Sequence, residues 1–417
     1  GAYLALFAGI TTMMAGVLVR RAGTPLAVAF PLVALAVEEL RASGELGFPW
    51  FQPGYTQHAF VPVIQLASLG SVSLVTLWLL GVNAASWRAW KTRRPAAVAT
   101  ALVLFAIAWV WGGAVVARAP RPSGPAVGLV QGCIPGEIKW AGGHEQEILN
   151  AFLELSRRAA SDSLKPDIVI WPETATGSYL RKQLDQMLAV TEFAAREHVT
   201  VFSGFPDYEL GSDGKPRYLN AGGLFRPDGP WPTVYAKRHL VPFGERMPFQ
   251  WLVPGLGKID LGQAEWTPGR ETVLFPGGSG RFGCLVCFES IFPDLARDDV
   301  RRGATWLVNV TNDEWFGLGA ALYQHAAMAV FRSVENRVPL ARCANTGLTM
   351  MVDPWGRVTA QAPVWKPAVV VARLAAPGPP TMYDRFGDWP GAAALVTVCV
   401  LACVALGRAL TPRRRAE

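Results

Sequence analysis

The sequence has little cysteine, histidine or charge, and each shortage excludes something. Six cysteines scattered over 417 residues do not make a disulfide framework. A zinc site needs more ligands than Cys284 and Cys287, and the five histidines form no cluster that would supply them, so we expect no metal. Charged residues make up 17% of the chain against 51% hydrophobic residues, which is too apolar for an ordinary soluble enzyme.

The basic residues lie beside apolar runs. The formal net charge is +7, and its main clusters are Arg20-Arg21, residues 91–94 and residues 413–415. That placement is typical of membrane flanks rather than of a surface that reads nucleic acid. We therefore expect a membrane protein with no nucleic-acid partner.

Five long apolar segments are candidate transmembrane spans. They cover residues 3–19, 24–40, 59–86, 96–117 and 389–408. Each approaches or exceeds the roughly 17–25 residues that cross a bilayer, and their clustering at the two ends of the chain argues against buried core helices. Glu38 and Glu39 are expensive in lipid, but they lie near the outer end of the second segment, where they can reach the interface.

The basic clusters also predict the orientation. Under the positive-inside rule all three clusters are cytoplasmic, and alternate threading then puts the loop 41–58 and the whole block 118–388 outside. We expect about four transmembrane helices in residues 1–117 and an extracytoplasmic catalytic domain in residues 118–388. A last transmembrane helix and a basic cytoplasmic tail would occupy residues 389–417.

The block 118–388 has the pattern of an α/β domain. Short β-rich runs alternate there with helical patterns. The runs are 126–131, 167–171, 200–204, 281–287 and 305–310, and the helical patterns are 144–160, 180–197, 294–302 and 322–337. Such alternation predicts a layered α/β fold. The stretch 242–280, rich in Pro, Gly and Trp, is too long for a plain connection and predicts a functional loop.

Cys287 ends one of these β-rich runs, just before a helix. Open α/β sheets place reactive groups at the C-terminal ends of their strands, and a helix N-terminus would lower the pKa of the thiol, so Cys287 is a candidate nucleophile. Cys284 lies three positions earlier and points to the opposite face of the strand, which argues against a chelate or a disulfide between them. We expect Cys284 to pack in the core; whether Cys133, Cys284 or Cys343 pairs elsewhere stays open.

Two further strand ends carry candidates for proton transfer and charge stabilisation. Glu173 follows the run 167–171, where a partly desolvated carboxylate suits proton transfer. Lys237 follows another strand, where a fixed ammonium can stabilise a developing oxyanion. Taken alone, Glu173 has the alternative of an acid at a helix N-terminus, and Lys237 that of a solvated surface lysine.

Glu173, Lys237 and Cys287, in this chain order and each at a strand end, resemble the triad of the nitrilase superfamily. Longer motifs make the resemblance more specific. They are Gln131-Gly-Cys-Ile-Pro with Lys139-Trp140, Trp171-Pro-Glu-Thr, Lys237-Arg-His-Leu-Val-Pro-Phe-Gly-Glu, Cys287-Phe-Glu, and Asn309-Val-Thr-Asn-Asp-Glu-Trp-Phe-Gly with Gln324-His325. Together with the flanking spans, these motifs resemble the apolipoprotein N-acyltransferase family over essentially the whole chain. That family normally has about eight spans, so we expect about three to be missing before Gly1.

The resemblance implies a fold and a catalytic triad. The fold is a four-layer α-β-β-α sandwich, inserted here between transmembrane helices. Glu173 would be the general base, Lys237 the oxyanion stabiliser and Cys287 the nucleophile.

Other positions carry over from the same family pattern. Glu245 and Glu289 would be secondary carboxylates that hold Lys237 and shape the site, and Trp140 and Phe288 would line the substrate cavity. The chain departs from the pattern at two points. Phe288 stands where the family usually has tyrosine, and Cys133 stands where it often has asparagine.

The implied reaction is N-acylation of the α-amine of the diacylglyceryl-cysteine of an apolipoprotein. A phospholipid would donate the acyl chain through a thioester on Cys287, without a cofactor, at the periplasmic side of a bacterial inner membrane. Moving a long acyl chain into water would cost roughly 10 kcal/mol. We therefore expect the site to face the bilayer surface and the apolar loop 247–256 to act as a lid.

Three other functions compete with this one. A membrane-tethered nitrilase-type amidase would share the triad but hydrolyse small amides, for which several spans are not needed. A Cys–His hydrolase would pair Cys287 with His239 or His325. A transporter or scaffold with a degenerate domain would have no reason to keep all three triad residues at strand ends.

Overall fold

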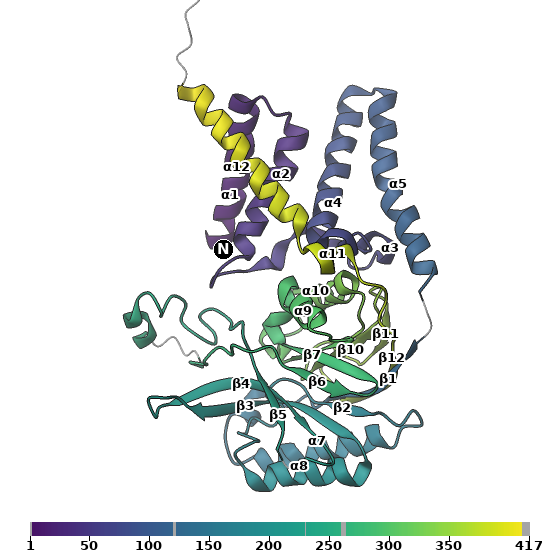
Figure 1. The fold of residues 1–417 in the computed structure, drawn as a ribbon, viewed down its shortest axis with the longest axis vertical. Helices are drawn as coiled ribbons and strands as arrows, with labels where there is room; N and C mark the ends of the chain where they lie inside the picture. The colour runs from purple at the N-terminus through teal and green to yellow at the C-terminus, as the bar shows by residue number, and fades with distance from the viewer. Residues whose placement is uncertain (1, 120–121, 230, 260–263, 411–417) are drawn as a thin grey trace, which may run out of the picture. The chain divides into compact units, whose positions relative to one another are not determined.

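The computed structural model describes residues 2–119, 122–229, 231–259 and 264–410. The chain divides into two compact units, one formed by Gly1–Arg118 with Thr381–Glu417 and the other by Ala119–Pro380. The first unit is helical and the second is α/β (Figure 1). The α/β unit is therefore inserted in the chain between helices, as the sequence predicts.

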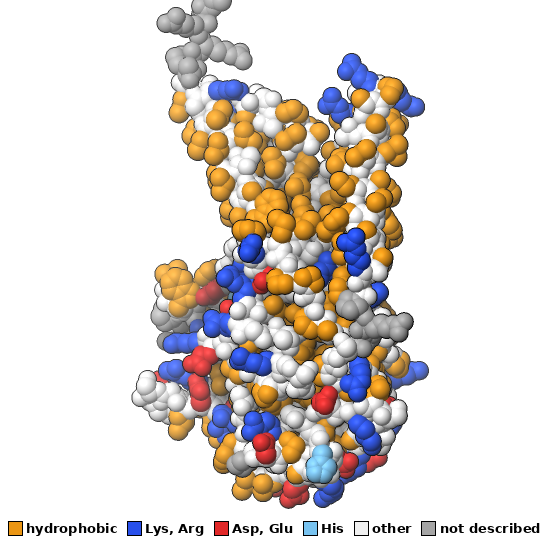
Figure 2. All heavy atoms as spheres, turned by 45° about the vertical axis from the view of Figure 1, so that its right-hand side comes forward, with side chains coloured by type: hydrophobic (Ala, Val, Ile, Leu, Met, Phe, Trp, Pro, Cys, Tyr) orange, Lys and Arg blue, Asp and Glu red, His pale blue; other side chains and the backbone are white. Residues whose placement is uncertain are grey.

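The helical unit contains seven α-helices among its described residues. They are α1 (Ala2–Val17), α2 (Leu26–Ala42), α3 (Val61–Ile64), α4 (Ala67–Thr92), α5 (Pro95–Ala117), α11 (Met382–Phe386) and α12 (Trp389–Leu410), and the π-turn η1 (Leu18–Ala22) extends α1. Within the described part of the chain, four helices are long and apolar enough to cross a membrane: residues 2–22, α4, α5 and α12. The side chains along these helices are mostly hydrophobic (Figure 2).

Two of the five predicted spans differ from the structure. The second predicted span forms α2, which has 17 residues and contains Pro31, so its length is at the lower limit of what crosses a bilayer. The third is interrupted, because α3 ends at Ile64 and α4 has a kink at Gly70 and Ser71, where the backbone leaves the helical region. Within the described residues four of the five predicted spans thus coincide with helices long and apolar enough to cross a membrane, and a crossing by α2 stays a prediction.

Several basic side chains of the helical unit lie at one end of its long apolar helices (Figure 2), whereas Arg41 and Arg118 lie at the opposite ends of α2 and α5. Arg20 and Arg21 lie in η1, and Arg93 lies in the turn between α4 and α5. Arg408, near the end of α12, donates a hydrogen bond of 2.8 Å to the carbonyl oxygen of Ala22. The ends of α1, α4 and α12 thus share one side of this unit, in the arrangement that the positive-inside rule requires. The predicted basic residues 413–415 lie outside the described residues.

The α/β unit contains two six-stranded sheets within its described residues. The first has the order β12-β1-β2-β3-β4-β5 and the second β11-β10-β9-β8-β7-β6. The strands of the first are β1 (Pro122–Gln131), β2 (Ile168–Ile170), β3 (Thr200–Leu210), β4 (Pro216–Phe225), β5 (Thr233–Ala236) and β12 (Ala368–Ala375). Those of the second are β6 (Leu274–Gly277), β7 (Gly280–Val286), β8 (Trp306–Thr311), β9 (Leu340–Ala344), β10 (Met350–Val352) and β11 (Val358–Gln361).

Helices cover the outer face of each sheet. α7 (Glu145–Ala160) and α8 (Leu184–Glu197) pack on the first sheet, and α9 (Pro293–Arg301) and α10 (Ala320–Asn336) pack on the second (Figure 1). The short helix α6 (Gly136–Lys139) follows β1. The unit is thus an α-β-β-α sandwich, and the predicted fold is confirmed.

The strand β2 explains why its sequence is apolar without alternation. Ile168 and Ile170 face the second sheet, whereas Val169 packs with the helices α7 and α8. A strand that is covered on both faces excludes water from every side chain, so all three residues are hydrophobic.

Candidate active site

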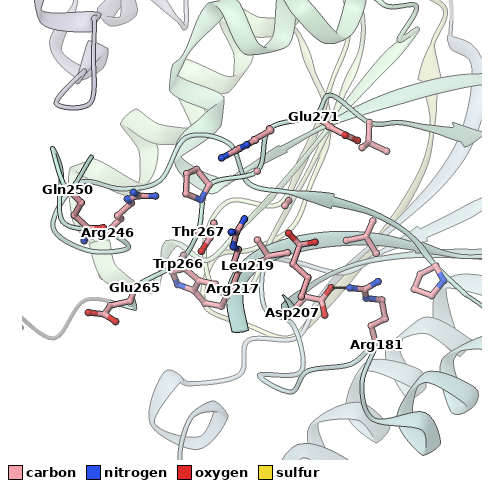
Figure 3. A pocket seen from close by; sticks show the side chains of 18 of the residues that line it. Arg181, Asp207, Arg217, Leu219, Arg246, Gln250, Glu265, Trp266, Thr267 and Glu271 are labelled. Atoms are coloured by element: carbon pink, nitrogen blue, oxygen red, sulfur yellow. Dashed lines mark ion pairs between the residues drawn. The ribbon is translucent and has the colours of Figure 1, made fainter. Parts of the chain in front are cut away.

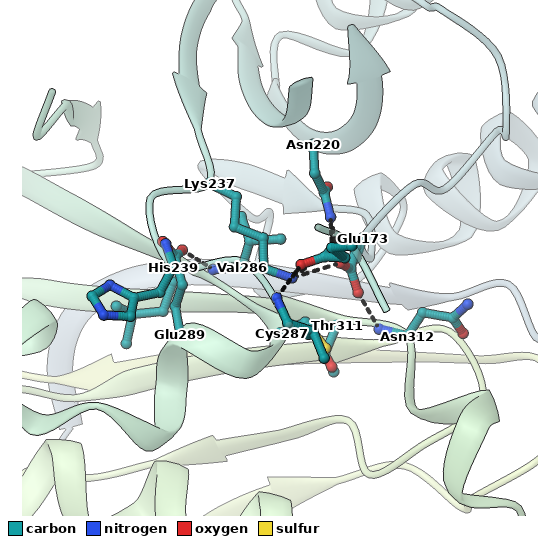
Figure 4. Close-up of polar contacts among 12 residues, drawn as sticks. Glu173, Asn220, Lys237, His239, Val286, Cys287, Glu289, Thr311 and Asn312 are labelled. Atoms are coloured by element: carbon teal, nitrogen blue, oxygen red, sulfur yellow. Dashed lines mark hydrogen bonds and ion pairs between the residues drawn. The ribbon is translucent and has the colours of Figure 1, made fainter. Parts of the chain in front are cut away.

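Glu173, Lys237 and Cys287 meet at strand ends of the α/β unit (Figure 4). Glu173 follows β2, Lys237 follows β5 and Cys287 follows β7. The Nζ of Lys237 lies 3.6 Å from Oε1 of Glu173, and the charges of both groups act on the Cys287 thiol. The residues predicted as a triad therefore form one cluster.

Lys237 is the paired cation of this cluster. Its side chain is 1% exposed, and its Nζ lies 2.9 Å from Oε2 of Glu245. Burial by itself lowers the pKa of Lys237, but the carboxylates of Glu245 and Glu173 outweigh burial and raise the pKa above its ordinary value. The ammonium is therefore charged at neutral pH and keeps its place.

Both oxygens of Glu173 are held by hydrogen bonds. Asn220 Nδ2 donates to Oε1 at 2.8 Å, and the backbone N–H of Asn312 donates to Oε2 at 2.9 Å. The same Asn220 amide also donates to Glu245 at 2.9 Å. The carboxylate that would take a proton is thus fixed in position by two strands and a loop.

Cys287 begins a 3-10 turn directly after β7, with φ of 50°. A non-glycine residue in this left-handed region is strained, and such strain is concentrated at functional sites. Burial and the carboxylate of Glu173 raise the pKa of the Cys287 thiol, and Lys237 with the Thr311 hydroxyl offsets only part of this. The predicted lowering by a helix N-terminus is wrong, because α9 begins only at Pro293. A thiol of this kind needs a base to become a nucleophile.

Glu289 is a fully buried carboxylate that braces the backbone around the cluster. Its Oε1 accepts hydrogen bonds from the Tyr235 hydroxyl at 2.7 Å and from the Arg238 N–H at 2.7 Å. Its Oε2 accepts from the Val286 N–H at 2.8 Å. Glu245 is the carboxylate that pairs with Lys237, whereas Glu289 ties the end of β5 to the end of β7.

A second, fully buried polar cluster lies behind the nucleophile. His325 Nε2 lies 3.1 Å from the carbonyl oxygen of Cys287, and its Nδ1 lies 3.0 Å from Oδ1 of Asp313. Arg342 donates to the other oxygen of Asp313 at 2.7 Å. Burial and the Arg342 charge lower the pKa of His325, although Asp313 opposes them. Through the contact between His325 and the Cys287 carbonyl, this cluster helps to fix the strained turn at Cys287.

The two other predicted site residues are Trp140 and Phe288, and their lining of a substrate cavity stays a prediction. Trp140, directly after α6, is 52% exposed. Phe288 is buried and packs edge-on against Phe292, with ring centroids 5.2 Å apart. The imidazole of His239 packs at a tilt against the same Phe292 ring, with ring centroids 4.4 Å apart.

The cysteines left open by the sequence are free thiols in the described part of the chain: Cys133, Cys284 and Cys343. Cys284 is buried between the two sheets, as predicted. Cys133 has φ of 54°, a backbone conformation that asparagine adopts more readily than cysteine. The asparagine of the family pattern at this position thus has a physical explanation.

Sequence reasoning missed two groups that the structure places in the cluster. Asn220 is an amide inside the buried strand β4, between Leu219 and Ala221. Thr311 ends β8 and bonds both the Cys287 thiol and Asp313. A single polar residue within a buried run was the available signal, since buried polar groups are almost always hydrogen-bonded.

A cavity of about 1000 Å³ lies on the other face of the first sheet (Figure 3). Leu219 and Ala236 line it, whereas their neighbours Asn220 and Lys237 point to the carboxylates. Alternate residues of a strand face opposite ways, so the cavity is separated from the cluster by the sheet. Its lining carries both charge signs: Arg181, Arg217, Arg246, Arg270, Asp207, Glu209, Glu265 and Glu271.

Comparison with known proteins gives matches along the chain. Residues 126–377 match the carbon-nitrogen hydrolase family, and residues 1–85 match the apolipoprotein N-acyltransferase N-terminal domain. The apolipoprotein N-acyltransferase of Geobacter metallireducens is 36% identical over 97% of this chain and 79% of that protein. That of Azotobacter vinelandii is 33% identical over 99% of this chain and 79% of that protein.

Among solved structures, an amidase from Nesterenkonia sp. is similar with a TM-score of 0.45 and 18% identity. The similarity covers 62% of this chain and 93% of the amidase.

Proposed function

The chain belongs to the apolipoprotein N-acyltransferase family of the carbon-nitrogen hydrolase superfamily, and we propose that it performs the family reaction through a thioester on Cys287. The observation that carries this proposal is the meeting of Glu173, Lys237 and Cys287 at three strand ends. A thiol with a raised pKa, a fixed carboxylate and a permanently charged ammonium are the parts that nucleophilic acyl transfer needs.

In the first half-reaction a phospholipid donates its acyl chain. Glu173 takes the Cys287 proton as the sulfur attacks the ester carbonyl, and Lys237 with backbone N–H groups near residue 288 stabilises the oxyanion. The carbon–oxygen bond of the ester then breaks. Glu173 returns the proton to the departing oxygen, which leaves a lysophospholipid and an acyl thioester on Cys287.

In the second half-reaction the neutral α-amine of the acceptor attacks the thioester. Glu173 takes a proton from the attacking nitrogen, the carbon–sulfur bond breaks, and the proton passes to the Cys287 thiolate. The products are an amide and the free thiol, so the enzyme returns to its starting state. Since Lys237 keeps its charge throughout, the same ammonium serves both tetrahedral intermediates.

The substrates of this reaction are a phospholipid donor and a diacylglyceryl-modified apolipoprotein acceptor, and the protein is a bacterial membrane protein. We place it in the inner membrane with the α/β unit on the periplasmic side. This is supported by the basic end of the helical unit, since the chain leaves α5 and enters α12 at the opposite end of those helices.

We also propose that the loop 247–256 covers the site as an apolar lid. Its aromatic and aliphatic side chains are well exposed: Trp251 by 70%, Leu252 by 63% and Phe249 by 37%. An acyl chain withdrawn from lipid needs such a surface. The triple change of Phe249, Trp251 and Leu252 to serine should slow turnover on membrane-embedded substrate, and unchanged turnover by a folded variant would remove the lid from the mechanism.

The proposed function is tested by mass spectrometry of the whole chain after incubation with phospholipid. We expect an acyl group on Cys287 that disappears on addition of a diacylglyceryl lipopeptide, with the amide product formed in equal amount. Cys287→Ala should show no adduct. A chain that takes no acyl group from phospholipid but releases ammonia from small amides would be an amidase instead.

A further inference from the structure

A second lysine is buried beside the proposed base. Lys139, the last residue of α6, is 3% exposed. Its stem packs against Gly177, where an added Cβ would lie 2.7 Å from Lys139 Cγ. Gly177 is in the loop that begins at Glu173, and its φ of 69° suits glycine. The loop of the base therefore leaves room for this lysine.

The ammonium of Lys139 has no hydrogen-bond partner among the described residues. The carboxylates that act on its charge belong to Glu173 and Glu314. Both oxygens of Glu173 already accept hydrogen bonds, and Glu314 accepts the N–H of Gly136 at 2.8 Å at the start of α6. Burial lowers the pKa of Lys139 to about 8 although both carboxylates oppose it.

A buried donor without a hydrogen-bond partner is unfavourable, so one that a native structure keeps calls for a role. At neutral pH Lys139 is mostly protonated and offers N–H donors inside the protein. Lys237 is the cation that acts most strongly on the Cys287 thiol, so the reacting carbonyl already has its ammonium. The acceptor for Lys139 is then a more distant oxygen of the substrate.

We propose that Lys139 binds an oxygen of the part of the acyl donor that leaves, the glycerophosphate portion of the phospholipid. This rests on the proposed function and adds a substrate-binding residue to it. A lysine ammonium is a common point-charge partner of phosphate oxygens, and a phosphodiester oxygen would supply the hydrogen-bond acceptor that Lys139 lacks among the described residues. The glycerol ester oxygens are the other source of the same contact.

The test compares the full chain with Lys139→Met and with Lys215→Met, a matched change of an exposed lysine. Acylation of Cys287 is measured with three donors of the same chain length: a phospholipid, a diacylglycerol and a p-nitrophenyl ester. We expect Lys139→Met to slow acylation by phospholipid by roughly 10- to 100-fold, the effect of losing one hydrogen bond to a charged group. Acylation by the p-nitrophenyl ester should be spared.

The diacylglycerol separates the two sources. If the phosphate is the ligand, Lys139→Met should acylate Cys287 from diacylglycerol at the parent rate, as with the p-nitrophenyl ester. If a glycerol ester oxygen is the ligand, acylation from diacylglycerol should slow as much as acylation from phospholipid. The melting temperature of Lys139→Met should equal or exceed that of the parent chain, because methionine removes an unpaired buried charge.

Equal loss with all three donors, a lowered melting temperature, or a defect confined to the amine-transfer half-reaction would overturn the inference. A parent chain that accepts the acyl group from the p-nitrophenyl ester but not from phospholipid would overturn the proposed function, and this inference with it.

Discussion

Among the described residues of the α/β unit, Lys139 and Lys237 are buried, and they differ in what surrounds the ammonium. Lys237 has Glu245 at 2.9 Å and Glu173 at 3.6 Å, whereas Lys139 has no hydrogen-bond partner among the described residues. The pKa of Lys237 is raised and that of Lys139 is lowered, although burial acts in the same direction on both. Pairing, rather than burial, therefore decides how each lysine behaves.

The difference separates two tasks within one site. A paired ammonium is held in advance, so it can stabilise an oxyanion without reorganising. An unpaired one is costly to the fold and is useful only when a ligand brings the missing oxygen. The predictions below test whether the two lysines differ in this way.

Replacement of Lys237 should have the largest effect. Lys237→Met leaves the buried Glu173 and the half-buried Glu245 without their cation, and removing one partner of a buried ion pair typically destabilises a protein by about 3–5 kcal/mol. We expect the variant to lose thioester formation and to melt well below the parent chain in detergent. If Lys139→Met destabilised the protein as much as Lys237→Met, the distinction between the two lysines would be lost.

Glu173→Gln should remove the chemistry and spare more of the fold. Glutamine has the size of glutamate but cannot take the Cys287 proton, so acylation in a single turnover should slow by about 10²- to 10⁴-fold. Lys237 keeps Glu245 at 2.9 Å, so the loss of melting temperature should be smaller than in Lys237→Met. Glu154→Gln, on the exposed face of α7, is the control. A Glu173→Gln chain acylated at the parent rate would assign the proton to another group.

His325 belongs to the buried cluster with Asp313 and Arg342, whose side chains are paired, as that of Lys237 is. His325→Leu removes the hydrogen bond to the Cys287 carbonyl, and we expect acylation to slow by roughly 10-fold, the effect of about 1–1.5 kcal/mol. His325→Gln should recover part of the rate, since its amide can donate to the same oxygen. A full recovery of the pH–rate profile in the glutamine variant would fit a positioning role, and equal rates in both variants would exclude it.

The pH dependence of stability should distinguish the lysines by sign. The folded-state pKa of Lys139, about 8, is below its ordinary value of 10.5, so the unfolded chain holds this proton more tightly and the destabilisation is complete below pH 8. It fades as pH rises from about 8 toward 10.5. Lys237 has a raised folded-state pKa, so its stabilisation persists over the same range and is lost only at higher pH.

The measurement is the melting temperature of both methionine variants relative to the parent chain between pH 7 and pH 10. The melting temperature of Lys139→Met should exceed that of the parent chain by less as pH rises. The melting temperature of Lys237→Met should stay below that of the parent chain by a constant amount. Parallel pH curves for the two variants would show that their ammonium groups lie in equivalent surroundings.

Much of the fold follows from local patterns in the sequence. The predicted runs and helices correspond to β1, β2, β3, β7 and β8 and to α7, α8, α9 and α10, because each carries a long apolar or amphipathic signal. The strands β9 to β12 lie after the last predicted run and were not predicted. β10 and β11 have three and four residues, too few for a periodic signal, and their pairing depends on neighbours distant in the sequence.

Reactive residues of the candidate site could be predicted where they follow a strand. Properties that depend on three-dimensional neighbours could not. Glu173 and Cys287 follow apolar runs and could be identified from the sequence. The opposite states of Lys139 and Lys237 could not, since both are lysines after short structured segments and only the three-dimensional neighbours distinguish them. The raised pKa of Cys287 was missed for the same reason, because it comes from burial of the thiol and from the charge of Glu173, which follows another strand.

The smallest predicted effect concerns backbone strain on the Lys139 side of the site. Cys133, shortly before α6, has φ of 54° and is held there because its N–H donates to the Asn345 carbonyl at 3.0 Å. Such a conformation costs a non-glycine residue of order 1–3 kcal/mol, and asparagine tolerates it better. Cys133→Asn should therefore raise the melting temperature by about 2–4 °C, whereas Cys133→Val, with a branched Cβ, should lower it. Equal melting temperatures for the two variants would mean that the turn at Cys133 relaxes to suit either residue. The position of α6 would then not depend on the backbone conformation at Cys133.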